Sequence, residues 1–269
     1  MSHPLTARLR DSDPEERRAA CREAVEDPSA ILLVDALCAA LADPVKEVAR
    51  EASASLAKIG ARHGGVTTAL GAALRGSDPR ARLFAALAIG RLGPPPLKLL
   101  PALVDALALA DGDLRFAAAR LLVDLGRLEP EVLGMLCALV AGGERPEVRR
   151  MAVFALRELA PDREETARAL VAASRAGDAA LRRAALASFA ALRDPDAGVF
   201  ARLSEAMAAE ADPAARALAA GALCELVSAH PERAGADVRS ALAAAAAKGP
   251  LPARRAASRA LEQLGAPTT

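Results

Sequence analysis

The sequence contains very few aromatic residues, with five Phe and no Trp or Tyr among 269 residues. Cysteine is scarcer still. The four cysteines, at positions 21, 38, 137 and 224, are too far apart for a paired metal-binding motif or a dense disulfide framework. Each falls in a helical pattern, so we expect buried thiols. The formal net charge is only +1, so overall charge provides no attraction to nucleic acid or to an anionic membrane.

Long apolar runs are also missing. No window reaches the roughly 18 uncharged apolar residues of a membrane span, and the amino terminus lacks the apolar core of a signal peptide. We therefore expect a cytoplasmic protein that makes no membrane contact. Lysine occurs only at positions 46, 58, 98 and 248, beside many Arg, Ala, Gly and Pro residues. This bias leads to the hypothesis of a GC-rich bacterial genome.

A recurring helical pattern organises the whole chain. We call its first residue the anchor position, filled by Arg18, Ala49, Arg82, Arg115, Arg149, Arg182, Arg216 and Arg254 at intervals of 31 to 38 residues. Three places later stands Ala or Cys, and seven places later stands Leu, Ile, Val or Phe. A period near 33 residues with helical spacing inside it indicates a stacked helical array.

The pattern divides the chain into eight repeats, each read as a short helix, a turn that often contains Asp-Pro, and a second helix carrying the anchor position. The expected fold is all-α, one continuous solenoid of about eight helical hairpins forming a single domain. The repeats span 1–27, 28–60, 61–93, 94–126, 127–160, 161–193, 194–229 and 230–269. In the turns, Asp accepts hydrogen bonds from free amides of the first helical turn, and Pro fits the first helical position.

These residues resemble the HEAT family of helical-hairpin repeats, in particular the short bacterial variety also seen in phycobilisome-lyase-like proteins. The resemblance rests on Asp212-Pro213, Arg216, Ala219 and Leu223 and on their counterparts along the chain. It implies a right-handed superhelix whose second helices line the concave face, and it implies no reaction. Tetratricopeptide repeats would need Trp and Tyr, and armadillo repeats are longer and have a third helix.

The anchor arginine lies at the margin of the buried stripe of its helix. Its stem can cover the seam between repeats while its head group reaches a carboxylate or carbonyl in a turn. We favour this structural role over a ladder of arginines that contact a ligand.

The opposite side of the second helices should face the concave groove. In the middle repeats it combines apolar residues with arginine, a combination typical of binding surfaces. The candidate partner-binding residues are Leu83, Leu87, Phe116, Arg120, Arg150, Phe154, Arg157 and Arg183. Two alternatives remain open: the helix phase is off by one position, or a curved array buries these residues between neighbours.

Signals for catalysis, metals and cofactors are absent from the sequence. The three histidines, at positions 3, 63 and 230, have no Cys, Asp or Glu at metal-ligand spacing. We expect a non-catalytic scaffold or adaptor that binds a protein or peptide with acidic and hydrophobic residues, and no nucleic acid. The alternatives are an enzyme or enzyme subunit of bilin-lyase or DNA-glycosylase type, and a structural unit that stacks end to end, which the polar terminal repeats disfavour.

Overall fold

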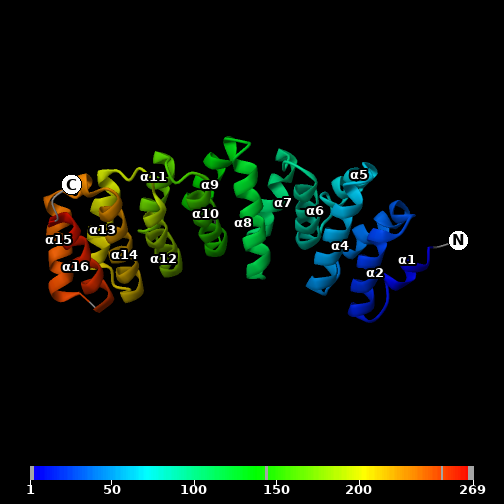
Figure 1. Ribbon diagram of the computed structural model, residues 1–269, viewed down its shortest axis with the longest axis horizontal. Helices are drawn as coiled ribbons and strands as arrows, with labels where there is room; N and C mark the ends of the chain where they lie inside the picture. The colour runs from blue at the N-terminus through cyan, green and yellow to red at the C-terminus, as the bar shows by residue number, and fades with distance from the viewer. Residues whose placement is uncertain (1–2, 143–144, 250, 266–269) are drawn as a thin grey trace. The chain divides into compact units, whose positions relative to one another are not determined.

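The described part of the chain is helical and contains no strand (Figure 1). It comprises residues 3–142, 145–249 and 251–265 of a computed structural model, without the side chains of residues 248, 251 and 252. The fold is an all-α solenoid of helical hairpins, as the repeat pattern predicts. It divides into two compact units, the N-terminal unit Met1–Glu129 and the C-terminal unit Pro130–Thr269. The boundary falls between repeats 4 and 5, and a single domain for the whole chain stays a prediction.

The N-terminal unit contains four hairpins. Its helices are α1 (Pro4–Arg8), α2 (Pro14–Glu26), η1 (Ala30–Leu33), α3 (Val34–Ala40), α4 (Lys46–Gly60), α5 (Gly65–Ala73), α6 (Pro79–Leu92), η2 (Leu97–Leu99), α7 (Leu100–Ala106) and α8 (Gly112–Gly126), where η marks a 3₁₀ helix. The second helices α2, α4, α6 and α8 pack side by side in one layer (Figure 1).

The C-terminal unit also contains four hairpins. Its helices are α9 (Glu131–Gly142), α10 (Pro146–Leu159), α11 (Glu164–Ala173), α12 (Ala179–Ser188), η3 (Phe189–Ala191), α13 (Ala197–Ala209), α14 (Pro213–Ala229), η4 (Pro231–Arg233), α15 (Ala236–Lys248) and α16 (Leu251–Gly265). Here α10, α12, α14 and α16 form the layer of second helices, and α9, α11, α13 and α15 form the layer of first helices.

Aspartate caps most of the second helices, as the turn sequences predict. The Asp78 carboxylate accepts a hydrogen bond from the Arg80 amide, and the Asp212 carboxylate accepts one from the Ala214 amide. Repeat 2 departs from this pattern, because α4 begins at Lys46, two residues after Pro44. There Asp43 accepts from the Val45 amide and also binds Arg17, so Asp43 and Pro44 belong to the turn.

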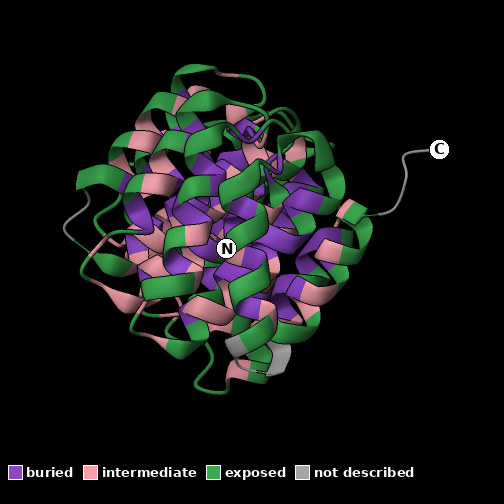
Figure 2. Ribbon diagram, turned by 90° about the vertical axis from the view of Figure 1, so that its left-hand side faces the viewer, coloured by how far each residue is buried: buried purple, intermediate pink, exposed green. Residues whose placement is uncertain are grey.

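Small side chains fill the seams between second helices. Ala52, Ala85 and Ala118, three places after their anchor positions, are completely buried. At Gly90 a Cβ atom would lie 2.8 Å from Leu121 Cδ1, so the glycine admits the close approach of α6 and α8. Figure 2 shows buried residues enclosed by helices with exposed outer faces. Alanine at these places therefore sets the spacing of the stack.

Buried polar groups also join neighbouring helices. Ser53 donates a hydrogen bond to the Phe84 carbonyl of α6, and Ser55 donates one to the Cys21 carbonyl of α2. Arg202, only 5% exposed, donates to both the hydroxyl and the carbonyl oxygen of Ser174. These bonds satisfy groups that would be costly to bury unpaired. Among the described residues, the helices include none with the length and apolar character needed to cross a bilayer.

Candidate partner-binding surface

Several anchor arginines donate hydrogen bonds to backbone carbonyls in the turn of their own hairpin. Arg82 Nη1 donates to the carbonyl oxygens of Gly76 and Ser77, at 2.9 and 3.1 Å. Its Nη2 donates to the Asp105 carboxylate in the next hairpin, at 2.6 Å. Because these bonds occupy the guanidinium, Arg82 connects consecutive repeats and is not available to a ligand.

The same arrangement recurs in other repeats. Arg115 Nη1 donates to the carbonyls of Leu109 and Ala110. Arg182 Nη1 donates to those of Ala176 and Gly177, and Arg182 also pairs with Glu210. Arg149 donates from Nε to the carbonyl of Val140. These contacts confirm the structural interpretation of the anchor arginine at these positions.

In repeat 1 the anchor is Arg17 and not Arg18. Helix α2 follows its cap Asp13, so Arg17 is the fourth residue after the cap, as Arg82 is after Asp78. Arg17 Nη1 donates to two turn carbonyls, and its Nε lies 2.7 Å from an Asp43 carboxylate oxygen. The pattern in this repeat is therefore displaced by one residue.

The structure corrects one candidate residue of the N-terminal unit. Leu83 is completely buried and Leu87 is half-buried, so Leu83 cannot contact a partner. Helix α6 lies between α4 and α8. Lys46 at the start of α4 reaches past it, with Nζ 2.7 Å from Asp111 and 3.1 Å from Asp113 at the start of α8. The starts of α4 and α8 therefore approach each other across α6, which means that this layer of helices is curved. We attribute the burial of Leu83 to this curvature.

Exposed residues on the second helices of the N-terminal unit combine apolar and cationic side chains. Phe116 is 47% exposed, and Arg120 stands one turn further along α8. Arg50 on α4 and Arg91 on α6 are exposed as well. We call these four exposed residues, together with the half-buried Leu87, the basic face: Arg50, Leu87, Arg91, Phe116 and Arg120.

The three arginines of the basic face form no ion pair with any described residue. Most carboxylates on the same helices already have cationic partners: Glu51 lies near Arg18 and Arg22, Asp113 near Lys46, and Asp124 near Arg127. Desolvation of Arg91 against its neighbours, followed by the positive charge of Arg50, lowers the pKa of Arg91. Arg91 also donates to Ser53 Oγ, at 3.1 Å. The basic face thus carries positive charge that its own unit does not neutralise.

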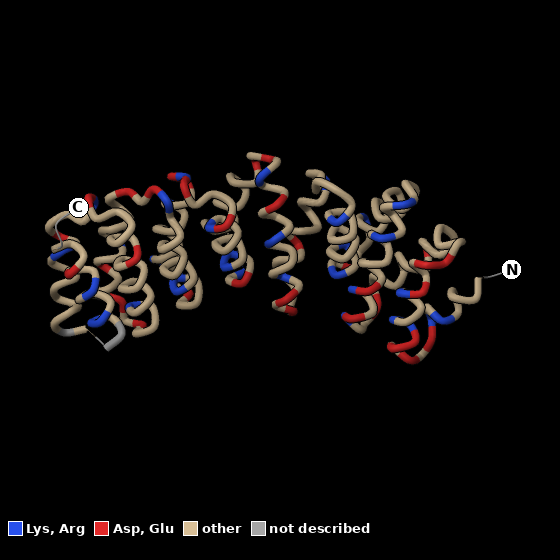
Figure 3. Tube along the Cα trace, viewed as in Figure 1, with Lys and Arg blue, Asp and Glu red and all other residues tan. Residues whose placement is uncertain are grey.

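The candidate arginines of the C-terminal unit have internal partners instead. Arg150 lies 3.8 Å from an oxygen of Asp178, and Arg183 lies 3.5 Å from one of Asp212. Both aspartates cap the second helix of the following repeat. Figure 3 shows acidic and basic residues interspersed on these helices. An incoming carboxylate would therefore compete with a capping aspartate.

Phe154 and Arg157 occupy one side of α10. The Arg157 guanidinium carbon lies 5.3 Å from the centroid of the Phe154 ring, within the range of a cation–π interaction. Arg157 also pairs with Glu158, at 2.8 Å. Both Phe154 and Arg157 are half-buried.

Titratable groups outside these surfaces have structural surroundings. Within the residues that the structure describes, no three His, Cys, Asp or Glu side chains are arranged to hold a metal ion. Burial raises the pKa of Cys21 to about 12, and burial raises that of Cys224 to about 11. These thiols are protonated at neutral pH, which makes them poor nucleophiles.

The sequence pattern could have revealed more of the basic face. Arg50 stands one place after the anchor Ala49, the same place that Arg150 and Arg183 occupy in their repeats. Arg50 lies in repeat 2, outside the middle repeats that contain the candidate residues. Lys46 offered no such signal, since its contact with Asp111 depends on how three second helices pack.

Comparisons with known proteins match part of the chain to a family of helical repeats. A family model described as HEAT repeats matches residues 67–157. An engineered protein of known structure is 21% identical with a TM-score of 0.50, over 97% of this chain and 78% of that chain. A search of curated protein sequences finds no match.

Two natural proteins of known structure are also similar. Importin beta is 15% identical with a TM-score of 0.62, over 97% of this chain, which spans 40% of the importin beta chain. Human deoxyhypusine hydroxylase in complex with glycerol is 20% identical over 97% of this chain and 94% of that one, and its TM-score of 0.40 is too low to support an argument. At these identities the likeness shows the fold alone.

Proposed function

We propose that this chain, of which residues 67–157 match the model of HEAT repeats, is a non-catalytic adaptor that binds an acidic segment of a protein partner on the basic face of its N-terminal unit. The proposal follows from the site, because the fold is compatible with many roles.

The observation that carries the proposal is the set of exposed arginines without carboxylate partners. Arg50, Arg91 and Arg120 come from three adjacent second helices, and Phe116 is exposed beside Arg120 on α8. Unopposed positive charge attracts an acidic partner and sets its orientation. A large aromatic side chain supplies the apolar contact area that usually dominates binding energy.

The candidate residues of the C-terminal unit have a weaker part in this proposal. Arg150 and Arg183 would have to exchange a capping aspartate for a carboxylate of the partner, which reduces the net gain. Phe154 and Arg157 offer a second pair of aromatic and cationic groups, with Glu158 already beside the arginine.

The test compares two charge-reversed variants of equal charge. The first replaces Arg50, Arg91 and Arg120 with Glu. The matched control replaces Arg10, Arg75 and Lys98 with Glu, three exposed cations of the same unit that also form no ion pair with the described residues. Partners cross-linked to the wild-type chain are identified by mass spectrometry, and their binding to each variant is then measured by calorimetry.

We expect the basic-face variant to bind an acidic protein partner at least about tenfold more weakly, and the control to bind it within about twofold of wild type. Circular dichroism confirms that both variants are folded. Equal binding by both variants would show that the basic face is not the binding surface. Recovery of nucleic acid alone, lost in the first variant, would overturn the assignment of a protein partner.

A further inference from the structure

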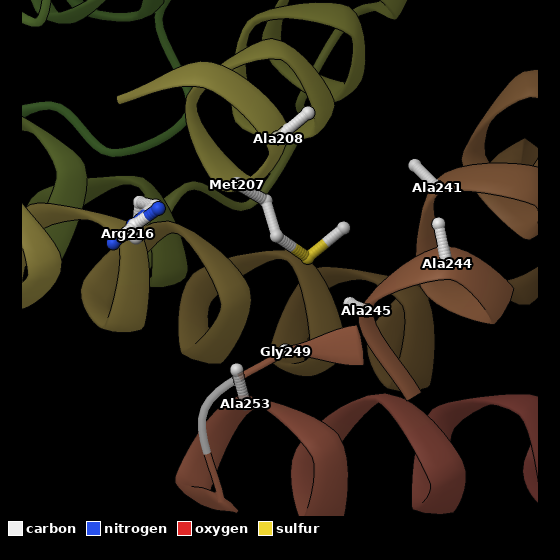
Figure 4. Close-up of a pocket in the computed structure, with 8 residues that line it drawn as sticks. All are labelled: Met207, Ala208, Arg216, Ala241, Ala244, Ala245, Gly249 and Ala253. Atoms are coloured by element: carbon white, nitrogen blue, oxygen red, sulfur yellow. The ribbon is translucent and has the colours of Figure 1, made fainter. Parts of the chain in front are cut away.

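A pocket of about 290 Å³ lies within the C-terminal unit, away from the surfaces described above. Its lining comes from α13, α14, α15 and the start of α16, and it includes Met207, Arg216, Ala241, Ala245, Gly249 and Ala253 (Figure 4). The Met207 side chain extends from α13 toward the wall formed by α15 (Figure 4). Gly249 ends α15 here, where a Cβ atom would lie 2.5 Å from the Ala245 carbonyl oxygen.

Arg216 is the anchor residue of repeat 7, yet it lacks the carbonyl contacts that Arg82, Arg115 and Arg182 make. Its Nε atom is buried and has no hydrogen-bond partner. Within the described chain, Arg216 forms no hydrogen bond to a turn carbonyl and no ion pair. Arg182, the preceding anchor, has two turn carbonyls and Glu210 as partners.

The missing partner of Arg216 follows from the sequence of α15. Glu210, which pairs with Arg182, stands 28 residues after it, and the residue 28 places after Arg216 is Ala244. Arg82 and Arg17 likewise find carboxylates in the next repeat, at Asp105 and Asp43. In repeat 8, an alanine-rich wall stands where repeats 2, 4 and 7 place Asp43, Asp105 and Glu210.

The pocket therefore combines apolar walls with one cationic donor that lacks an acceptor. A buried N–H group without an acceptor is unfavourable and calls for a partner. We propose that the pocket binds a small aliphatic monocarboxylate, whose carboxylate pairs with Arg216 as Asp105 pairs with Arg82, and whose hydrocarbon chain lies against Met207 and the alanines.

The chemistry of the lining selects this class of ligand. A single arginine does not neutralise a dianion, and the apolar walls would desolvate the second charge at high cost. An amine would be repelled by the guanidinium. The volume falls at the lower limit of the roughly 300–1,000 Å³ typical of small-molecule sites, so a short chain fits better than a long one.

Met207 provides a direct readout of binding in the full-length chain. Methyl-¹³C methionine labelling gives few signals, because the chain has four methionines, and the Met207 signal is assigned by its loss in Met207→Leu. Hexanoate is titrated as the probe, with 1-hexanol as the neutral analogue of the same length. We expect hexanoate to shift the Met207 methyl signal saturably while the Met135 and Met151 signals stay in place.

Two variants and one control test the pairing. Arg216→Gln should weaken hexanoate binding about tenfold or more and remove the preference over hexanol, because a charge-assisted hydrogen bond is lost. Ala241→Leu should reduce the binding of both probes by filling the pocket. Arg175→Gln, which changes an exposed arginine in the same unit, should bind hexanoate like wild type.

Two results would overturn the proposal. An equal response of Met207 to hexanoate and hexanol would show that Arg216 does not recognise the carboxylate. The absence of any shift at tens of millimolar hexanoate would show a packing gap and not a ligand site. Neither result would affect the proposed function of the basic face, which lies in the other unit.

Discussion

Arginine has two different roles in two regions of this molecule. At the seams between repeats, the guanidinium groups donate hydrogen bonds to turn carbonyls and to a carboxylate of the next repeat, as in Arg17, Arg82 and Arg182. On the basic face, Arg50 and Arg120 form no ion pair with the described residues. The comparison teaches that the partner supplied by the neighbouring repeat decides the role. Arg216 is a seam arginine whose buried Nε has no hydrogen-bond partner, so the neighbouring repeat leaves it without either role.

The largest expected effect separates two anchor arginines of the C-terminal unit. We expect Arg182→Met to lower the free energy of unfolding by about 2–4 kcal/mol, because it leaves Glu210 without its cationic partner. The Glu210 side chain is only 8% exposed. Arg216→Met should change the free energy of unfolding by less than about 0.5 kcal/mol, since no hydrogen bond is lost. Urea denaturation measures both.

Equal losses in these two variants would remove the basis of the comparison. A large loss in both would mean that the arginine stem, and not its head group, stabilises the seam.

A smaller effect concerns the pH dependence of the same seam. Burial alone would raise the pKa of Glu210, but the hydrogen bond from Arg182 and further favourable contacts lower this pKa below its ordinary value of 4.5. A carboxyl group with a lowered folded pKa stabilises the protein above its unfolded pKa, and the stabilisation is lost as the pH falls through the folded value. The seam should therefore weaken under acid conditions.

Glu210→Gln tests this dependence. Between pH 7 and pH 3, we expect a smaller drop in the free energy of unfolding for Glu210→Gln than for wild type. Glu225→Gln, at an exposed residue of the same unit, should keep the wild-type pH dependence. Parallel profiles for all three proteins would show that Glu210 does not contribute to the acid sensitivity.

The sequence predicts the parts of this structure that depend on local spacing. Asp78 caps α6 and Arg82 returns to the turn because the two residues are four places apart, which is a fixed distance on a helix. Leu83 was placed wrongly because its burial depends on the packing of α4, α6 and α8, which a helical wheel does not contain. The assignment of Arg18 failed for a simpler reason, since the repeat pattern tolerates a shift of one residue where several small and apolar residues adjoin.

The unpaired state of Arg216 was partly visible in the sequence. The seven residues from Ala241 to Ala247 include no Asp or Glu, whereas Asp105 and Glu210 occupy the corresponding region of other repeats. That absence has meaning only once the contacts of Arg82 and Arg182 are known. The pocket beside Arg216 could not be predicted, because its volume depends on the positions of four helices.

The smallest expected effect compares exposed arginines in the two units. Arg183→Met should lower the free energy of unfolding by up to about 1 kcal/mol, because it removes a partly exposed ion pair with the cap of α14. Arg120→Met on the basic face should change it by less than about 0.5 kcal/mol, since no ion pair with a described residue is lost. If Arg120→Met is the more destabilising of the two, Arg120 has a structural role, and the basic face then loses one of the three cations on which its assignment as a binding surface depends.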